Sequence, residues 1–443
     1  MRKTGIAILA LVMMVAAPAL GAGYGLKEHS ADAMAAAYAG SAATGTDASY
    51  LAYNPAAAGL VSDVDFSISV VEILPGSSGA YQLAKTSAGT PSGGSLDPHG
   101  FIKSATVPAL GLRWRISDRW AFGLAITAPW GLATDYSNSW AGRYYGLKSK
   151  LLTIDVTPIV SYQLTRDITV AAGPQIEYAQ GTLTSAIDTG TLGALNGIPG
   201  SVPGGQDSFA RLSGTNWGYG YELGAIDHLT DDLTLGLSYH SAIQHDLRGP
   251  LTFKLDDTGI GATIRALTGL FTDTHNKTRL TMPDMVLFGA RLDLSDRWTG
   301  LLEADWTNWS RVHELSVVAA NPLQPDDVTT TSWHNALFGS LGLEYRVDPR
   351  WMLRDGVAYD QSPVPDATRE PRIPDADRIW LSTGVSYRWS DKTDIKLTAS
   401  RLYNLKTDVA LNPTQTGNAL RGTLKGSTSS FVDVLGLQFT FRP

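Results

Sequence analysis

Serine, aspartate and arginine recur side by side in this chain, and these residue types can do chemistry together. The sequence Ser-Asp-Arg-Trp stands at 117–120 and again at 295–298, and Asp-Pro-Arg-Trp stands at 348–351. A serine beside an aspartate could act as a nucleophile with a charged partner. The same residues are equally typical of tight turns, because the short Asp side chain hydrogen-bonds nearby backbone amides. The secondary structure predicted around these clusters is needed to distinguish a catalytic site from a turn.

Other signals of catalysis or metal binding are weak. The eight histidines show no HExxH spacing, and neither a GxSxG nor a GxxxxGK[ST] motif occurs. The chain has no cysteine, which excludes disulfides, thiolate metal sites and thiol nucleophiles. We therefore expect no enzyme activity, no metal site and no cofactor.

Composition indicates a folded chain that does not bind nucleic acid. Apolar residues make up 43% of the 443 residues and charged residues only 17%, which argues against disorder. The formal net charge is −7, whereas nucleic-acid binding favours basic patches.

The first residues predict a secretory signal peptide, residues 1–21. Arg2 and Lys3 form its positive end, an apolar run follows from Gly5 to Ala17, and Ala19-Leu20-Gly21 supplies small residues for cleavage. The protein is therefore expected to be exported. Beyond this segment no run of about 18 apolar residues occurs, so membrane-spanning helices are not expected.

The rest of the chain alternates between apolar and other residues with a period of two, as strands with two different faces do. After the second Ser-Asp-Arg-Trp, one face carries Trp298, Gly300, Leu302, Ala304 and Trp306. Short polar breaks alternate strictly with long connections, and runs of about ten or more residues lie between them. This pattern predicts fourteen strands, near 64–73, 104–116, 119–128, 150–165, 168–182, 217–229, 232–246, 278–294, 297–313, 333–347, 350–361, 377–390, 393–405 and 430–442.

Fourteen strands with every long connection at one end favour an all-β fold, a 14-stranded antiparallel transmembrane β-barrel of an outer membrane. In it the repeated Ser-Asp pairs form periplasmic turns. The Trp residues that follow them, Trp120, Trp298 and Trp351, lie at one membrane interface, where aromatic rings with a polar edge are favoured. We expect the barrel and its long external loops to span residues 63–443.

Residues 22–62 break the alternation and predict a plug inside the barrel. Residues 24–60 are rich in Ala, Ser30 can cap a short helix through Met34 and Tyr38, and Asn54-Pro55 imposes a turn. A mostly small, apolar segment ahead of a barrel fits the lumen.

Several stretches resemble one known family. The segments AGYGLKEHS and AYAGSAATGTDASYLAYNPAAAGL resemble the plug of the FadL/TodX-like long-chain fatty-acid and hydrocarbon transporters of Gram-negative outer membranes. Further similarity lies in PWGLATDYSNSWAG, NWGYGYELGAIDHLTDDLTLGLSYHS, LTMPDMVLFG and DQSPVPDATREPRIPDADRIWLSTG. The resemblance covers essentially the whole mature chain. It implies passive uptake of hydrophobic small molecules through a fourteen-stranded barrel with an N-terminal plug.

The resemblance also implies roles for particular residues. An external groove would capture the ligand, a tighter pocket would lie beside the N-terminus, and a kink in the third strand would open the wall sideways. The expected groove residues are Trp130, Trp140, Tyr144, Tyr145, Ile264, Leu267 and Phe271; the pocket residues are Tyr24 and Leu26; the plug and gating residues are Asn54, Pro55, Ala56, Pro129 and Gly131. Packing of the loops, strand termination at Pro129 and a helix-ending turn at Asn54 are the alternatives.

One departure from the family concerns the charge of the ligand. Fatty-acid members carry basic residues on the fifth strand, but residues 178–185 contain none here. An uncompensated buried carboxylate is costly. Either another base (Arg143, Lys148, Arg211 or Arg265) meets the carboxylate, or the ligand is a neutral hydrocarbon.

Two other functions stay open. Ser238 and His240 share one strand face, which leaves an outer-membrane lipase as an alternative, although that face is expected to look inward. An adhesin or phage receptor would act through the loops alone. The expected partners are a hydrophobic small molecule and outer-membrane lipids, and the expected state is a monomer.

Overall fold

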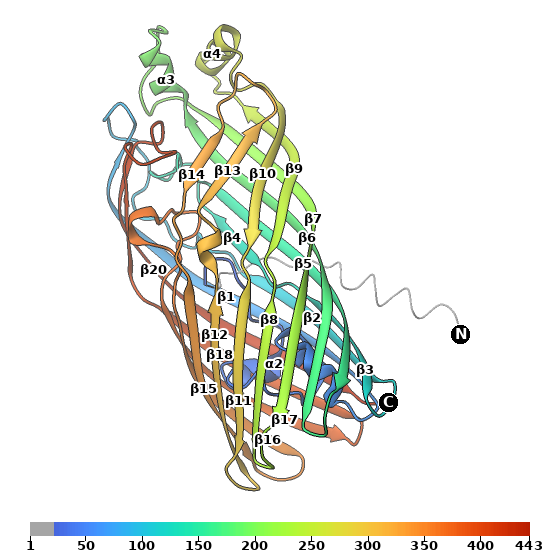
Figure 1. The fold of residues 1–443 in the computed structure, drawn as a ribbon. Helices are drawn as coiled ribbons and strands as arrows, with labels where there is room; N and C mark the ends of the chain where they lie inside the picture. The colour runs from blue at the N-terminus through green and yellow to red at the C-terminus, as the bar shows by residue number, and fades with distance from the viewer. Residues whose placement is uncertain (1–21) are drawn as a thin grey trace.

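The computed structural model describes residues 22–443, so the predicted signal peptide lies outside the described residues. The described chain is a single antiparallel barrel, seen from the side in Figure 1. Its strands are β1 (Val64–Lys85), β2 (Ala105–Arg115), β3 (Trp120–Thr127), β4 (Gly131–Asp135), β5 (Lys148–Gln163), β6 (Ile168–Asp188), β7 (Asp207–His228), β8 (Leu233–His240), β9 (Ile243–Lys254), β10 (Thr274–Met282), β11 (Met285–Asp293), β12 (Trp298–Thr307), β13 (Glu314–Ala319), β14 (Asp327–Thr330), β15 (Ala336–Arg346), β16 (Trp351–Asp360), β17 (Arg378–Ser390), β18 (Thr393–Asn404), β19 (Thr407–Leu411) and β20 (Thr423–Phe441).

These segments make fourteen strands, because six strands are interrupted once, which confirms the predicted fold class. The interrupted strands are β3/β4, β8/β9, β11/β10, β12/β13, β15/β14 and β18/β19. Neighbouring strands pair around the ring, and β1 closes the barrel on β20, from Phe66 opposite Phe441 to Lys85 opposite Thr423. Pairing of β1 with β20 thus leaves neither end of the described sheet as a free edge, as a bilayer requires.

Several strands are longer than the alternation predicted. β1 continues to Lys85, β7 already begins at Asp207 and β20 at Thr423, so parts of the predicted external loops are strand. In the membrane one strand face meets lipid and the other the lumen, which produces the alternation. Above the membrane both faces meet polar surroundings, and the pattern fades.

The repeated Ser-Asp-Arg-Trp clusters are turns, as predicted. Ser117 Oγ and Ser295 Oγ each accept a hydrogen bond from the backbone NH of the following Trp, 3.2 Å away in both cases. Each Trp then packs on a Tyr of the neighbouring strand. The pairs are Trp120–Tyr162, Trp298–Tyr345 and Trp351–Tyr387, with ring centroids 4.7, 4.4 and 4.4 Å apart. The clusters therefore mark one interface of the barrel.

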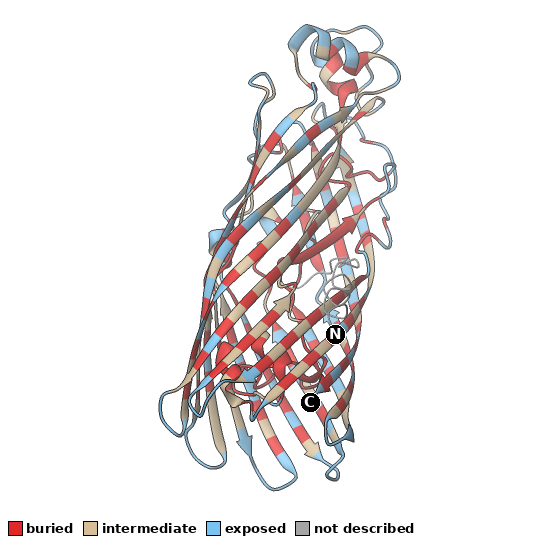
Figure 2. Ribbon diagram, turned by 90° about the vertical axis from the view of Figure 1, so that its right-hand side faces the viewer, coloured by how far each residue is buried: buried red, intermediate tan, exposed pale blue. Residues whose placement is uncertain are grey.

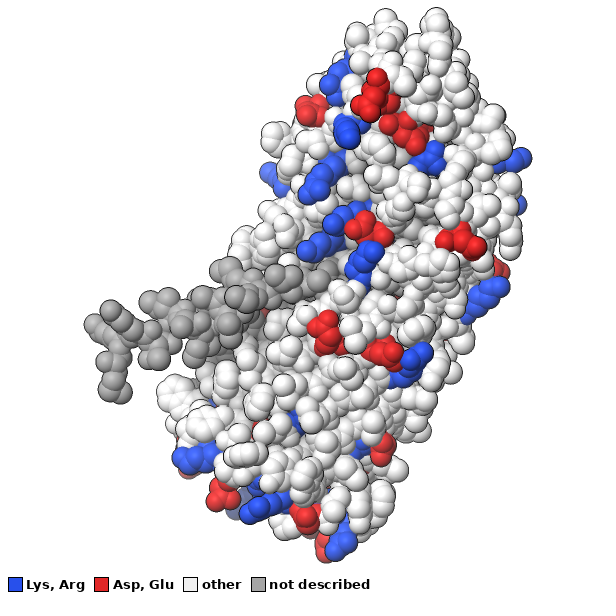
Figure 3. Space-filling model, turned by 180° about the vertical axis from the view of Figure 1, so that it is seen from behind, with Lys and Arg blue, Asp and Glu red and all other residues white. Residues whose placement is uncertain are grey.

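Buried and exposed residues alternate along the strands, as Figure 2 shows. Seen from behind in Figure 3, charged side chains gather on the upper part and at the lower end, with a mostly uncharged band between them. On β12 the outward residues include Leu302 and Trp306. Among residues 22–443, no helix has the length and hydropathy that a bilayer span requires.

Residues 24–60 lie inside the barrel as three short helical pieces, α2 (Ala31–Ala35), η1 (Ala48–Ala52) and η2 (Pro55–Leu60). Ser30 caps α2 by accepting from the backbone NH of Ala33, as predicted. The helix stops at Ala35 instead of reaching Tyr38, because Ala37 and Tyr38 take positive φ angles of 51° and 64°. Nearly all residues of this segment are buried.

The external end carries two longer helices, α3 (Thr189–Leu195) and α4 (Ile260–Thr268), side by side at the top of Figures 1 and 2. Two further 3-10 turns, η3 (Trp309–Arg311) and η4 (Asp366–Thr368), lie in the connections.

Candidate ligand path through the barrel

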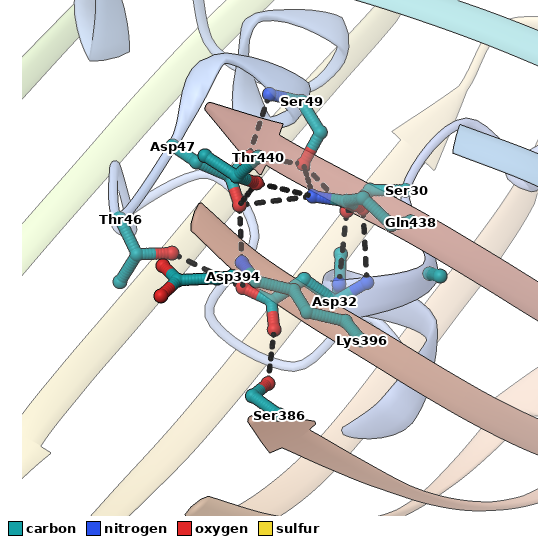
Figure 4. A network of polar contacts seen from close by, with 12 residues as sticks. Ser30, Asp32, Thr46, Asp47, Ser49, Ser386, Asp394, Lys396, Gln438 and Thr440 are labelled. Atoms are coloured by element: carbon teal, nitrogen blue, oxygen red, sulfur yellow. Dashed lines mark hydrogen bonds and ion pairs between the residues drawn. The ribbon is translucent and has the colours of Figure 1, made fainter. Parts of the chain in front are cut away.

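An ionic network ties the plug to the barrel wall at the level of β16 to β20 (Figure 4). Lys396 of β18 bonds Asp47 and lies 2.8 Å from Asp32, both carboxylates being fully buried. Arg354 of β16 contacts the other oxygen of Asp32 at 2.6 Å. Gln438 of β20 donates to Asp47 at 2.9 Å. The plug carboxylates thus have fixed partners on three strands.

Glycines on the inner face of the barrel admit the plug backbone. A Cβ at Gly236 would lie 1.9 Å from the carbonyl oxygen of Ala42, and one at Gly111 would lie 2.2 Å from that of Ala48. A side chain at either position would displace the plug.

The expected plug residues Asn54, Pro55 and Ala56 are all buried. Asn54 Nδ2 donates to the carbonyl of Ala42 at 2.7 Å and to that of Ala225 on β7 at 3.1 Å, while Oδ1 accepts from Ala56 N. Asn54 itself reaches β7 and β8, and Ala58 further along η2 lies against Gly123 of β3.

The third strand is interrupted at residues 128–130, where Pro129 and Gly131 were expected to break it. The plug takes over the pairing there, because Leu26 N donates to the Pro129 carbonyl and Gly131 N donates to the Tyr24 carbonyl, both at 2.8 Å. β2 pairs with β3 only from Leu110 to Arg115. The upper half of β2 therefore pairs with β1 alone, which leaves a break in the wall beside the plug.

Tyr24 joins the plug to an aromatic cluster, which consists of Tyr24, Trp130, Trp309 and Trp333. The Tyr24 ring centroid is 4.8 Å from that of Trp309, 5.6 Å from that of Trp333 and 5.9 Å from that of Trp130. All four side chains are at most 5% exposed. The start of the plug is therefore packed in place.

The inner cavity adjoins this cluster and has a volume of about 370 Å³. Tyr24 of the plug and its neighbour Trp333 line one side of this cavity, and Val312, Val364 and Ile373 add apolar surface. Leu26 lies outside it and lines a smaller cavity of about 70 Å³ together with Pro129 and Trp130.

The outer cavity lies above, among the external loops, and measures about 540 Å³. Apolar side chains from β6, β7, β9, β13 and β14 and from the connections line it, among them Leu183, Leu251, Phe253, Phe271 and Leu315. Leu315, Thr329, Glu370 and Arg372 line both cavities, so the two adjoin.

Arg372 is the cation at this junction. Nη1 donates to the Lys148 carbonyl at 3.3 Å and to Ser149 Oγ at 3.2 Å. The neighbouring Arg421 forms ion pairs with both nearby carboxylates, Glu370 at 2.9 Å and Asp327 at 2.7 Å. Arg372 forms no ion pair with any described residue, and burial lowers the pKa of its guanidinium to about 10. It is a charged donor that an arriving anion would satisfy.

Only part of the expected groove lines the outer cavity, namely Tyr144 and Phe271. Trp140 stacks on Tyr136 with centroids 4.3 Å apart, and Tyr145 Oη donates to the Gly422 carbonyl, so both side chains pack the loops together. Ile264 is buried in the contact between α3 and α4. Leu267 is 73% exposed and lies on the solvent side of α4. Helix-like spacing could not tell which face of α4 looks inward.

The four bases suggested by the sequence do not line either cavity. Arg143 is held by Asp207 at 2.5 Å, Lys148 lies near Asp135 at 3.9 Å, and Arg265 donates to the Phe271 carbonyl. Arg211 is exposed on β7. Arg372, Trp309 and Trp333 were not singled out from the sequence. The SPVP…IPDADR block, which contains Arg372, was the available signal for this residue.

Ser238, His240 and Glu222 form a polar chain on the inner face. Ser238 Oγ is 3.2 Å from His240 Nε2, and His240 Nδ1 is 3.3 Å from Glu222 Oε2. A serine hydrolase uses this order of groups. Here Ser238 is 1% exposed and Tyr53 of the plug covers His240, so the hydroxyl faces none of the described cavities.

A plugged fourteen-stranded barrel with adjoining apolar cavities belongs to the class of outer-membrane proteins that transport small hydrophobic molecules. The family of outer membrane protein transport proteins (OMPP1/FadL/TodX) matches residues 12–442. The chain belongs to this family.

Individual relatives agree with this assignment. The long-chain fatty acid transport protein of Escherichia coli O6:H1 is 28% identical over 414 residues, which cover 90% of this chain and 91% of the relative. Outer membrane protein P1 of Haemophilus influenzae is 25% identical and covers 90% and 89%. The crystal structure of a Pseudomonas aeruginosa FadL homologue has a TM-score of 0.86 at 24% identity, covering 95% of this chain and 99% of the homologue.

Proposed function

We propose that this protein takes up hydrophobic carboxylates, such as long-chain fatty acids, by passive diffusion through the outer cavity, the inner cavity and the wall break at β3/β4. The proposal rests on one observation, that the two apolar cavities meet at Arg372. Withdrawing about 200 Å² of apolar ligand surface from water contributes about 5 kcal/mol, so a groove of this kind can capture a ligand from dilute solution.

Arg372 favours a carboxylate over a neutral hydrocarbon, the two ligand classes that the sequence left open. Arg372 lines both cavities and forms no ion pair with any of residues 22–443. A purely hydrocarbon ligand would leave this buried charge without a direct ion-pair partner in an apolar path, which is costly. A carboxylate head group would pair with it and draw the chain of the ligand from the outer into the inner cavity.

The test compares two substitutions in the full chain, Arg372→Gln and the control Arg211→Gln. Arg211 is exposed on β7 and lines neither cavity. A hydrogen bond to a charged group contributes about 1.5–3 kcal/mol, so Arg372→Gln should weaken palmitate binding about 10- to 100-fold. Binding of a neutral hydrocarbon of similar length should change little, and Arg211→Gln should change neither.

Equal loss of palmitate and hydrocarbon binding in Arg372→Gln would contradict a role in recognising the carboxylate. Mass spectrometry of small molecules extracted from the purified protein gives an independent answer. A fatty acid is expected, and a neutral hydrocarbon alone would overturn the proposed ligand class.

The Ser238–His240–Glu222 chain motivates one check on a lipase function. We expect that the purified protein hydrolyses no ester lipid. Hydrolysis that His240→Gln abolishes would replace transport by catalysis as the proposed function.

A further inference from the structure

The barrel wall has a second break, between β10 and β13. Pairing of these strands runs from Asn276 opposite Ala319 to Arg279 opposite Ser316 and stops there. It resumes below, where Met285 of β11 lies opposite Thr307 of β12. Between these points residues 280–283 and 309–315 are not paired with each other. Glu314 and Leu315 instead pair with β14.

The inner cavity passes through this break. Leu315 on the lumen face of β13 lines it, and so do Ser316 and Val318 on the opposite face. Of these, Val318 is 43% exposed on the outside of the barrel. Residues on both faces of one strand can border the same cavity only where that cavity crosses the wall.

Tyr24 stands in the break from the inside. Its hydroxyl donates to the Thr281 carbonyl at 2.9 Å, in the stretch of β10 that has no strand partner on the β13 side. Its ring packs on Trp309, at the start of the unpaired stretch on the other side. The first residues of the plug therefore stand in for the missing strand pairing.

The break lies at the boundary between the apolar band and the polar outer zone. Just below it, Trp306 and Phe288 are the outward residues of β12 and β11. At its lower edge Arg311 bonds Asp284, and at its upper edge Lys277 and Arg279 share Asp246 at 2.9 and 3.3 Å. Aromatic residues below charged ones mark the head-group level of a bilayer.

The charge in the interior of the cavity, at Arg372, favours an anion. Four Lys or Arg side chains line it against two Glu side chains. Asp246 and Asp284 neutralise the cations at the mouth from outside the cavity, while Arg372 further in has no such partner among residues 22–443. An anionic head group that enters here meets its unpaired counter-charge in the interior.

We propose that the break between β10 and β13 is a second mouth of the inner cavity, through which anionic single-chain amphiphiles already dissolved in the outer leaflet enter sideways, with Tyr24 as the closing residue. This inference rests on the proposed function, because Arg372 and the inner cavity are common to both routes. It adds a path that bypasses the outer cavity.

The chain has no cysteine, so a single introduced thiol can block the mouth selectively. Ser316→Cys places the thiol on the outer face of β13 at the break, and Thr215→Cys places it on the exposed outer face of β7, away from both cavities. Each variant, in the outer membrane of intact cells, is modified with a bulky uncharged methanethiosulfonate and later released with a reducing agent. Uptake of labelled palmitate is measured after loading into the outer leaflet and, separately, from albumin in water.

We expect modification of Ser316→Cys to slow uptake from the loaded leaflet about tenfold, and reduction to restore it in the same cells. Uptake from water should change less than about twofold, and Thr215→Cys should respond by neither route. An unchanged leaflet rate would overturn the second mouth, and so would an equal loss by both routes. If unmodified protein gave no uptake by either route above cells that lack it, the proposed function itself would fail.

Discussion

Replacing Lys396 by methionine tests how the plug is held. Lys396 Nζ bonds Asp47 and lies 2.8 Å from Asp32 (Figure 4). Burial alone would raise the pKa of Asp47, but the Lys396 ammonium lowers it well below its usual range. Methionine keeps most of the side-chain volume and removes the charge, which leaves Asp47 buried without a cation.

The expected loss in the free energy of plug opening depends on which partners Asp32 and Asp47 keep after the substitution. Asp32 keeps Arg354 at 2.6 Å, whereas Asp47 keeps only neutral donors such as Gln438. Removing one partner of a buried ion pair typically costs 3–5 kcal/mol, and the surviving contacts place this case at about 3 kcal/mol. Opening of the plug should therefore become about 150-fold more frequent.

Hydrogen exchange measured by mass spectrometry on the full chain reports this opening. In Lys396→Met, amides of residues 30–60 should exchange about 150-fold faster, while amides of β5 and β6 keep their rates. The double variant Asp47→Asn with Lys396→Met removes both charges and should recover most of the protection. A change below about tenfold, or no recovery in the double variant, would refute the ionic account of plug seating.

Two further predictions use the same exchange readout. Burial lowers the pKa of His29 to about 4, so the closed plug is fully stable above the ordinary pKa near 6.5 and loses about 2 kcal/mol by pH 5; His29→Gln should remove that part of the pH dependence. Gly236→Ala would place a Cβ 1.9 Å from the Ala42 carbonyl oxygen and should speed plug exchange, whereas Gly339→Ala, with no atom within 4 Å of its Cβ, should not. Equal exchange in the two glycine variants would contradict the close approach of plug and wall.

The architecture could be predicted from the sequence because its determinants are local. Alternation with a period of two follows from a strand with one face on lipid, and Ser117 and Ser295 mark the turns by bonding within their own four residues. The plug helix cap at Ser30 is local in the same way. Strand number, orientation and the lumenal plug follow from these features together.

The candidate site could be predicted only in part. Tyr24 was expected to border a pocket and does line the inner cavity, but its partners Trp309 and Trp333 lie 285 and 309 residues further along the chain. Trp140 and Leu267 have the apolar side chains expected of groove residues but lie elsewhere. Trp140 is buried between loops, and Leu267 faces solvent. An apolar side chain is expected to be buried, but its type does not show which residues bury it.

The sequence by itself determined the barrel, the turns and the segment that fills the lumen, because each depends on residues a few positions apart. Tertiary structure alone decided which charge remains unpaired and where the wall stays open. Arg372 forms no ion pair within the described part of the chain because Arg421, from a distant connection, pairs with Glu370 and Asp327. The break between β10 and β13 depends on registers between strands that closure of the barrel fixes jointly. No short stretch of sequence contains that register.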